Sequence, residues 1–468
     1  MEITLPKNNV YCELLEELSK AIKGSKWENT VYLCGGCVRD LILGREIHDI
    51  DIVVAKYCGA ITFANWLTKE YGCFAPQSNP VVYKNSNCVK INIKTIEKFK
   101  KIDIEIRDTK ALKHEFGTLV EDAICRDLTI NSLYMDMCTK RVLDPTRKGL
   151  NDLKEGILRT PMEDRDTLFD VDPIKMMRIM RFHATLPFDI EKGTWIGIVK
   201  NAHKIEKAPI ENITNELSKI LVSEYRASIA LRKMYYNGLL KKVLPEVCAL
   251  KGCEQGIQHF GDAFDHTMNV VLNVQPYLSH RLGALFHDIA KPQTRCVING
   301  KVHFFSHEYR GITMAEEILT RMKFPNAIIE QVKLAVKNHM RFKQCQDIPN
   351  DKALRKFMSE MENSDNMALV LDVINADNMS HKLEYRNPEQ VNKIINRIIE
   401  LKDMEKNLGK SNKLPINGNE IMEYFGLKKG PKIGYYLDIV KDAYFENPNI
   451  TKEECFKEIE KIMHLDIV

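Results

Sequence analysis

The sequence lacks both the long apolar runs and the strong charge imbalance that would assign it to a membrane or to a polyanion by composition alone. No stretch approaches the roughly 18 consecutive apolar residues that span a bilayer. Residues 1–7 also hold no apolar segment of the kind found in secretory signals. Lysine and arginine total 68 against 64 acidic residues, and this net charge of +4 permits nucleic-acid binding without requiring it. We therefore expect a cytoplasmic protein with no membrane partner.

The cysteines lack the pattern of a disulfide-stabilised secreted protein. Thirteen of them are spread along 468 residues, and an odd number in so long a chain argues against a disulfide framework. We expect reduced thiols. The length itself suffices for about three or four domains of ordinary size.

A pair of glycines and a pair of aspartates near the N-terminus carry the strongest chemical signal. Val31-Tyr32-Leu33 predicts a strand that runs into Gly35 and Gly36, whose unhindered N–H groups can approach a phosphate. Asp49 and Asp51 lie two residues apart on a second predicted strand and therefore share one face. Such carboxylates repel each other unless a divalent cation lies between them, and Mg²⁺ carrying a nucleoside triphosphate suits open oxygen sites. Either pair alone is more often an ordinary turn or a solvated strand edge, but their order and spacing together predict nucleotidyl transfer.

Five segments resemble, in the same order, the class II nucleotidyltransferases, the family of the bacterial and eukaryotic CCA-adding enzymes and the bacterial poly(A) polymerases. The resemblance covers roughly half of the chain, which makes an accidental match improbable. The segments are Gly35-Gly36-x-Val38-Arg39-Asp40 with Asp49-x-Asp51, then Arg126-Asp127-Leu128-Thr129-Ile130-Asn131, then Asp144-Pro145 through Arg159-Thr160, then Asp172 to Phe182, and finally Glu211 to Leu221.

The resemblance implies a catalytic metal site built on Asp49 and Asp51. Two Mg²⁺ ions held there would activate the terminal hydroxyl of an RNA and steady the leaving pyrophosphate. A third carboxylate is expected on the predicted strand at 102–106, where Asp103 and Glu105 share a face. We favour Asp103 because of its spacing to Arg126-Asp127, and an exposed strand edge is the alternative.

The resemblance also assigns side chains to the incoming nucleotide. Gly36 and Arg39 would contact the triphosphate, with Arg39 presenting a forked guanidinium to its oxygens. Cys125 stands where the family usually has a second arginine, so phosphate binding is expected to be weaker or to be supplied from elsewhere. The triphosphate and the ribose hydroxyls would be held by Arg126, Asp127 and Asn131.

A predicted helix that begins near residue 172 takes the place of the family's base-reading helix. Asp172 matches the family's aspartate, but Val171 replaces its glutamate and Lys175 its arginine. Lysine donates from a single point, whereas arginine can make two parallel hydrogen bonds to a base. This replacement weakens the hypothesis that the protein selects strictly C and then A. Asp172 before a proline also fits an ordinary helix N-cap, and both interpretations can hold together. Arg178 and Arg181, a turn apart, would contact nucleotide or acceptor RNA, or form a solvated basic face.

The histidines gather in the second half of the chain, in an order that resembles the HD phosphohydrolase superfamily. Imidazoles and carboxylates on different helices can converge on one or two divalent metals and leave positions open for a water that attacks a phosphate ester. Imidazole ligands favour a transition metal, and Lys291 could stabilise phosphate. For His303 and His381 we favour a structural role. The expected ligands are His266, His287, Asp288, His307, His339 and Asp377.

The predicted fold class is α+β, a nucleotidyltransferase-type mixed sheet with helices followed by all-α domains. Apolar periodicity predicts a helix over 10–24, and β-branched runs predict strands at 31–33, 50–54, 89–93 and 102–106. Helical patterns follow in the rest of the chain. We divide it into a head, 1–160, a neck with the base-recognition helix, 161–250, an HD domain, 251–390, and a helical tRNA-binding tail, 391–468.

The favoured function is the addition of CMP and AMP, from CTP and ATP, to the 3′ end of tRNA, together with a phosphohydrolase activity of the HD domain. A poly(A) polymerase, or an enzyme that adds only CC or only A, is the alternative within the family. A second alternative is an HD nucleotide or cyclic-phosphate hydrolase with an RNA-binding head, and a third is a non-enzymatic RNA-binding protein. Acceptor RNA is expected along the neck and tail, held through phosphates and shape.

Overall fold

The computed structural model describes most of the chain. The described residues form two compact units, Met1–Val243 and Leu244–Val468, and each is treated by itself. These residues are 1–6, 9–70, 80–83, 88–92, 97–99, 102–112, 116–224, 226–343, 345, 348–407 and 414–465.

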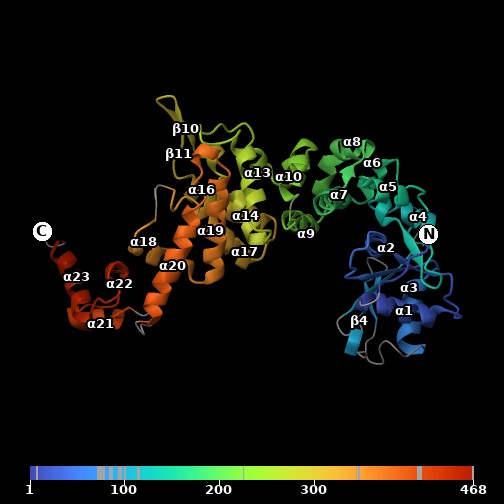
Figure 1. The fold of residues 1–468 in the computed structure, drawn as a ribbon, viewed down its shortest axis with the longest axis horizontal. Coiled ribbons are helices and arrows are strands. Elements are labelled where there is room, and N and C mark those ends of the chain that lie inside the picture. Colours follow the sequence, from blue (N-terminus) through green and yellow to red (C-terminus); the bar gives the residue numbers. More distant parts are fainter. Residues whose placement is uncertain are drawn as a thin grey trace. The chain divides into compact units, whose positions relative to one another are not determined.

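A mixed seven-stranded sheet, ordered β3-β4-β5-β2-β1-β6-β7, forms the head of the first unit (Figure 1). Within it β2 and β5 run parallel, and the other neighbouring pairs are antiparallel. The four predicted strands are present, although residue 93 lies outside the described residues. The strands are β1 Val31–Cys34, β2 Ile50–Val54, β3 Val81–Tyr83, β4 Cys88–Asn92, β5 Asp103–Asp108, β6 Tyr134–Asp136 and β7 Val142–Leu143.

Short helices accompany this sheet. The predicted N-terminal helix is α1, Val10–Ile22, which begins where the side chain of Asn9 accepts hydrogen bonds from two backbone N–H groups and which buries Leu14, Leu15 and Leu18. The α+β class of the head is therefore confirmed. The other head helices are α2 Gly36–Ile42, α3 Gly59–Asn65, α4 Leu119–Ile124 and α5 Gly149–Glu155.

The neck is helical, as predicted, apart from a two-residue parallel ladder between β8, Ile157–Leu158, and β9, Asp189–Ile190. Helix α7, Ile174–Thr185, packs against α9 and α10 through an apolar face that includes the fully buried Met176, Ile179 and Met180. That packing fixes which of its residues face the head. The remaining neck helices are α6 Arg165–Val171, α8 Lys192–Asn201, α9 Ile210–Leu221, α10 Ala227–Tyr236 and α11 Leu239–Val243.

Helices packed around α14 and α17 build the first part of the second unit (Figure 1). Helix α20 belongs with them, because its Ile394 and Leu401 share a core with Phe357 of α18 and Val370 of α19. A domain boundary at residue 390, as expected from the sequence, would therefore separate α20 from the core that it shares with α18 and α19. These helices are α12 Pro245–Cys248, α13 Ala263–Asn273, α14 Leu278–Phe286, α15 Lys291–Thr294, α16 His307–Arg321, α17 Asn326–Asn338, α18 Asp351–Met361, α19 Ser364–Met379 and α20 Gln390–Asn407.

A β-hairpin corrects the expectation of an all-helical second half. β10, Arg295–Ile298, pairs with β11, Lys301–Phe304, and the hairpin projects from the helices in Figure 1. Its two-residue turn, Asn299-Gly300, has positive φ at both positions, which suits the twist of antiparallel strands. The Asn-Gly pair between β-branched residues is the sequence signal that predicts such a hairpin.

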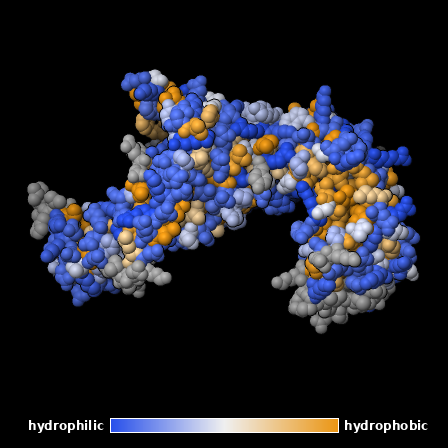
Figure 2. All heavy atoms as spheres, viewed as in Figure 1, coloured by the Kyte–Doolittle hydropathy of each residue, from blue (hydrophilic) through white to orange (hydrophobic). Residues whose placement is uncertain are grey.

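The tail has a small core of its own, formed by α21 Gly418–Phe425, α22 Pro431–Glu446 and α23 Lys452–Leu465. In Figure 2 the face of the tail that is seen is mostly hydrophilic. Among all the helices in the described ranges, none is long and apolar enough to cross a membrane.

Candidate active sites

The glycine turn brings the start of α2 close to a buried arginine. Gly35 has φ +73°, and a Cβ placed on it would lie 3.0 Å from Nη1 of Arg126. Both the backbone conformation and the space therefore require glycine here. The turn joins the end of β1 to α2, so Gly36 and Arg39 line the same cavity as Asp49 and Asp51.

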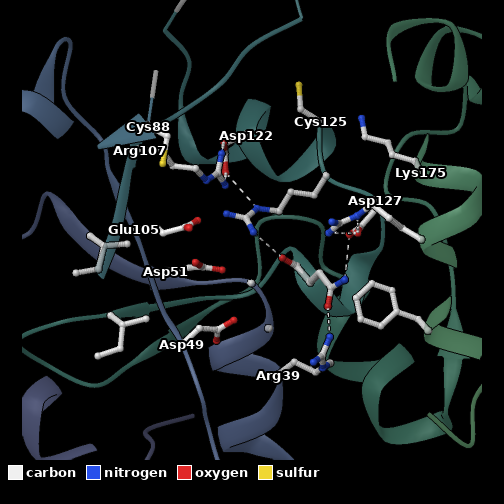
Figure 3. Close-up of a pocket in the computed structure, with 18 of the residues that line it drawn as sticks. Arg39, Asp49, Asp51, Cys88, Glu105, Arg107, Asp122, Cys125, Asp127 and Lys175 are labelled. Carbon is white, nitrogen blue, oxygen red and sulfur yellow. Dashed lines mark hydrogen bonds and ion pairs between the residues drawn. The ribbon is translucent and has the colours of Figure 1, made fainter. Parts of the chain in front are cut away.

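Three carboxylates lie together at one side of this cavity, one directly before β2 and two on the neighbouring strands β2 and β5. Figure 3 shows Asp49, Asp51 and Glu105 one beside the next, with their carboxylates pointing to the same side. Asp51 of β2 is the register partner of Glu105 on β5. Burial, then the charges of Asp49 and Glu105, raise the pKa of Asp51 to about 6. This arrangement disfavours the charged form of Asp51 until a cation joins the group.

The register changes the choice of the third carboxylate. Asp103 also lines the cavity and is the register partner of Asn92 on β4. Its carboxylate lies 2.8 Å from Nζ of Lys90, closer than the carboxylate of Glu105, which lies 3.9 Å from the same atom. Glu105 is the residue directly beside Asp51. The pairing of two strands that are distant in the chain therefore favours Glu105 over Asp103 as the third carboxylate beside Asp49 and Asp51.

The thiol of Cys37 contacts the same group from the side of α2. Its Sγ lies 3.2 Å from Oδ1 of Asp49, and it accepts a hydrogen bond from the backbone N–H of Asp51 at 3.4 Å. Burial, together with the charges of Asp49 and Asp51, raises the pKa of Cys37 well above its ordinary value, so the thiol keeps its proton and donates. Cys34 and Cys37 form a Cys-x-x-Cys pair of buried free thiols, a spacing that the expectation of scattered cysteines overlooked.

A buried ionic network stands opposite the carboxylates. Asp122, 1% exposed, accepts two hydrogen bonds from Arg107 and further ones from Arg126 and Tyr134. Burial alone would raise the pKa of Asp122, but the two arginines hold it well below its usual range. The network leaves Nη2 of Arg126 buried and without a hydrogen-bond partner among the described residues. An anion would satisfy this donor.

A second chain of hydrogen bonds runs from α7 to α2. Arg178 binds Oδ2 of Asp127 through two nitrogens, each at 2.7 Å, and Oδ1 of Asp127 accepts from Asn131. Burial opposes ionisation of Asp127, but Arg178 lowers its pKa to about 2. Asn131 in turn accepts from Arg39, whose fork faces Asp40. Arg39 therefore does not present its fork to the cavity, contrary to the sequence expectation.

Helix α7 presents the expected base-reading residues to the cavity. Asp172 does not cap it, because Pro173 occupies the N-cap position and no side chain caps the helix. The carboxylate of Asp172 instead lies 3.9 Å from Nζ of Lys175, whose side chain is almost buried. Arg181 is held at 2.6 Å by Glu216 of α9, and so neither Arg178 nor Arg181 belongs to a freely solvated basic face.

One cavity of about 910 Å³ unites these groups. All twelve residues that the sequence assigned to the metal and the nucleotide line it, although they come from separate segments. Glu105, Arg107, Asp122 and Lys219 line it as well, although none of them had been assigned to the metal or the nucleotide. Of these, only Glu105 had a sequence signal, the strand alternation that it shares with Asp103.

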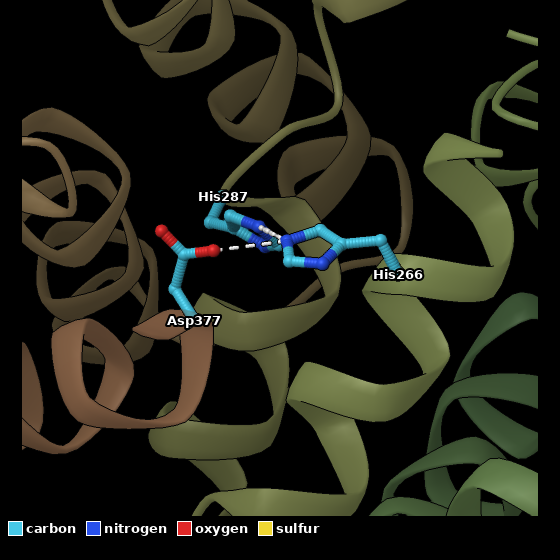
Figure 4. Close-up of side chains that lie close together, drawn as sticks. All are labelled: His266, His287 and Asp377. Carbon is cyan, nitrogen blue, oxygen red and sulfur yellow. Dashed lines mark hydrogen bonds and ion pairs between the residues drawn. The ribbon is translucent and has the colours of Figure 1, made fainter. Parts of the chain in front are cut away.

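A second group of titratable side chains converges in the second unit. His266 of α13, His287 at the end of α14 and Asp377 of α19 point toward one another (Figure 4). The Nε2 atom of His266 lies 2.9 Å from Asp377 and 3.4 Å from Nε2 of His287. These donors form one candidate metal group, and the other consists of Asp288, His307 and His339.

Asp288 joins the two groups. Its Oδ2 lies 3.0 Å from Nε2 of His287, while its Oδ1 lies 3.3 Å from Nε2 of His307 and 3.7 Å from that of His339. Lys291 also contacts Oδ2, at 2.6 Å. Buried imidazoles and carboxylates that share so little space suit divalent cations, and the residue types fit a transition metal. All six residues expected as ligands are therefore brought together.

Sequence comparison divides the chain in a similar way. Residues 31–159 match the poly A polymerase head domain, 187–251 match the probable RNA and SrmB-binding site of polymerase A, and 264–405 match the HD domain. The last match ends within α20, as the shared core suggests.

The relatives are tRNA nucleotidyltransferases of more than one kind. A CC-adding tRNA nucleotidyltransferase of Thermus thermophilus is 30% identical over 357 residues, which are 72% of this chain and 76% of the relative. An A-adding tRNA nucleotidyltransferase of Deinococcus radiodurans is 28% identical over 354 residues, 71% of this chain and 77% of the relative.

Solved structures of CCA-adding enzymes share the fold. The Bacillus stearothermophilus enzyme in complex with CTP superposes with a TM-score of 0.66 at 20% identity, covering 98% of this chain and 99% of that one. The Thermotoga maritima enzyme in complex with tRNA gives 0.60 at 19% identity, with 99% of both chains covered. The chain therefore belongs to the class II family of CCA-adding tRNA nucleotidyltransferases and poly(A) polymerases, and it carries an HD domain. Its head and its HD domain both imply divalent metals.

Proposed function

We propose that this protein adds CMP and AMP, from CTP and ATP, to the 3′ end of tRNA. The observation that carries the proposal is the placement of Asp49, Asp51 and Glu105 in one cavity with Arg126 and the base-reading helix α7. The relatives' names include CC-adding and A-adding enzymes, and solved relatives bind CTP, ATP or tRNA.

The residues of the head would have different roles in nucleotidyl transfer. Asp49, Asp51 and Glu105 would hold Mg²⁺, whose oxygen preference they fit. When bound, the metal promotes ionisation of the attacking 3′ hydroxyl and neutralises the leaving pyrophosphate. Arg126 directs its unpaired Nη2 at a phosphate oxygen. Arg39 donates a hydrogen bond to Asn131, which in turn donates to Asp127, and it would thereby stabilise the Asp127–Arg178 pair beside the nucleotide.

The remaining parts of the chain would bind the acceptor. We propose a head, 1–160, a neck, 161–250, an HD domain extended to the end of α20 at 407, and a tail that follows. Exposed lysines of the tail, such as Lys428, Lys429 and Lys432, suit contacts to phosphates. Affinity for tRNA should then fall as salt is raised, and an affinity that stays constant would contradict this docking.

Extension assays separate the possible products. Transcripts of one tRNA ending before CCA, after C and after CC are offered with CTP, ATP or both, and their ends are sequenced. A complete CCA end supports the proposal, CC or A alone identifies a partial enzyme, and a long A tail identifies a poly(A) polymerase. The double variant Asp49→Asn with Asp51→Asn is the control and should not extend any transcript. Extension at the wild-type rate by this variant would overturn the proposed site.

A second function is supported by the position of Asp288 between the two histidine groups. We propose that the HD domain binds one or two divalent transition-metal ions and hydrolyses phosphate esters of nucleotides or RNA ends. Bound metal would supply an activated water for attack on phosphorus. Lys291 and Lys343 would offset the charge of the phosphate, since they lie 2.6 Å from Asp288 and 3.6 Å from Asp377.

Metal content tests this second function directly. Wild-type protein purified with Mn²⁺ or Co²⁺ and then dialysed should retain metal, and His287→Ala and Asp288→Ala should lose it. His303→Ala is the matched control, because His303 stacks on Phe305 in the hairpin and is no member of the cluster. A wild type that retains no metal and hydrolyses no nucleotide phosphate would contradict the proposal, whatever the outcome for the head.

A further inference from the structure

The four histidines of the HD cluster are not supported in the same way. Three of them have Nδ1 within 2.8 Å of the carbonyl oxygen three residues earlier: His287 with Ala284, His307 with Phe304 and His339 with Val336. A carbonyl can only accept, so each of these rings carries its proton on Nδ1. The Nε2 lone pairs are thereby left for the centre of the cluster.

His266 is the exception. Its Nδ1 faces Nδ1 of another histidine, His259, at 3.4 Å, and both side chains are buried. His259 was not anticipated from the sequence, and it is not among the candidate ligands. Of two facing Nδ1 atoms, one must donate and the other must accept. The tautomer of His266 therefore depends on that of His259.

Two consistent arrangements of protons follow. In the first, Nε2–H of His266 donates to Asp377 at 2.9 Å, His259 donates from Nδ1 to His266, and Nε2 of His259 accepts from the amide of Gln258 at 3.3 Å. In the second, His266 carries its proton on Nδ1 and donates it to His259, whose Nε2–H then donates to the amide oxygen of Gln258 after that amide turns over. The two arrangements hold the same number of protons, and only the second frees Nε2 of His266 for a metal.

We propose that His259 is a positioning residue, which accepts a hydrogen bond from Nδ1–H of His266 and so fixes this ring for metal binding. The inference rests on the proposed metal function of the HD domain. His259 does the work that a backbone carbonyl does for the other three rings. Unlike a carbonyl, it can also stabilise the metal-free tautomer, in which His266 is bonded to Asp377.

The fold holds His259 firmly in this place. Residue 259 forms a β-bridge with His381, and the backbone N–H of Lys382 donates to the carbonyl of Gln258 at 2.9 Å. The ring of His381 packs 4.6 Å from that of His259. Gln258 also lines a cavity of about 200 Å³ together with Asp377 and Lys343. The hydrogen bonds from Gln258 through His259 to His266 thus connect the wall of this cavity with a proposed metal ligand.

Metal affinity tests the proposal without using any substrate. Full-length wild type and variants are titrated with Mn²⁺ or Co²⁺ against a chelator, and their melting temperatures are recorded with and without metal. His259→Phe fills the space but cannot accept a hydrogen bond, and we expect its affinity to fall about 10- to 100-fold, as for other residues that orient a ligand. His259→Gln retains an acceptor and should recover most of this loss.

His381→Phe is the matched control, because it changes a buried ring that packs on His259 but accepts no proton from His266. It should bind metal as the wild type does. If His259→Phe, folded by its metal-free melting temperature, binds metal like the wild type, the proposal is overturned. The same holds if His381→Phe or His259→Gln loses as much affinity as His259→Phe, because packing alone would then explain the effect. If neither wild type nor any variant binds metal, the proposed HD function fails instead.

Discussion

The thiol of Cys37 lies 3.2 Å from the carboxylate of Asp49, and it also accepts a hydrogen bond from the backbone N–H of Asp51. One side chain thus contacts both residues that are expected to hold the catalytic metal. It belongs to the first turn of α2, directly after the glycine pair. The glycine turn therefore has two consequences, since it leaves the backbone open to the cavity and it places a hydrogen-bond donor next to the carboxylate of Asp49.

Removing the thiol should weaken metal use by the head. In Cys37→Ala the carboxylate of Asp49 loses a donor of about 1 kcal/mol, so the Mg²⁺ concentration for half-maximal extension should rise about 3- to 10-fold. Cys37→Ser keeps a donor and should recover part of the loss. Cys12→Ala is the control, because it removes a buried thiol of the same unit outside the cavity. An unchanged Mg²⁺ dependence in Cys37→Ala would show that the contact has no role in metal binding.

Glu105 and Asp103 can be compared in the same assay. Glu105→Gln removes the carboxylate next to Asp51, and extension at saturating nucleotide should slow roughly 100-fold or more, because charge at the reacting phosphate is then less well balanced. Asp103→Asn removes a carboxylate that is paired with Lys90, and it should change the rate by a few-fold at most. The opposite order of effects would return the role to Asp103.

The raised pKa of Asp51 predicts a pH dependence of stability in the absence of metal. Its pKa of about 6 exceeds the ordinary value of 3.8, so the folded state binds this proton more tightly than the unfolded chain. The resulting stability is present below pH 4 and is lost as pH rises through 6, with a size of at most about 3 kcal/mol. Asp51→Asn should therefore raise the melting temperature of the head at pH 8 in a chelator.

The advantage of Asp51→Asn should disappear below pH 4, where Asp51 is protonated in both states. Added Mg²⁺ at pH 8 should stabilise the wild type more than the variant, because the cation removes the repulsion among the three carboxylates. Melting curves at several pH values check both statements. A variant that is less stable than the wild type at pH 8 without metal would contradict the raised pKa assigned to Asp51.

Local sequence patterns were sufficient for the main strands, for α1 and for the residues that gather in each site. Glycine turns, alternating carboxylates and the order of histidines are short-range signals, and the fold brings them together as expected. The preference for Asp103 over Glu105 could not take account of the register of β2 against β5, because these strands are separated by about 50 residues in the chain. Pairing between distant strands is set by tertiary packing, and local alternation does not contain it.

Other features of the structure were not predicted, for different physical reasons. The β10–β11 hairpin carries a clear Asn-Gly signal, and it was missed because the block around it reads as helical. The guanidinium of Arg39 donates two hydrogen bonds to Asp40, its neighbour in sequence, and no spacing rule predicts this pairing. His259 has no local signal either, because its proposed role depends on the contact between its ring and that of His266, which only the folded chain shows.

The base-reading role proposed for Asp172 and α7 gives the last prediction. Asp172 and Lys175 lie at the cavity with 3.9 Å between carboxylate and ammonium, close enough to hydrogen-bond neighbouring atoms on the edge of one base. Asp172→Ala should change the ratio of kcat/KM for CTP and ATP by about 10-fold or more, since a site built from hydrogen bonds discriminates through them. Lys175→Arg should sharpen the selection, because a guanidinium can make two parallel bonds where lysine makes one. Val171→Ala, an exposed neighbour, is the control and should leave the ratio unchanged. Single-nucleotide incorporation on trimmed tRNA measures all four proteins, and an Asp172→Ala variant with the wild-type ratio and rate would remove α7 from nucleotide selection.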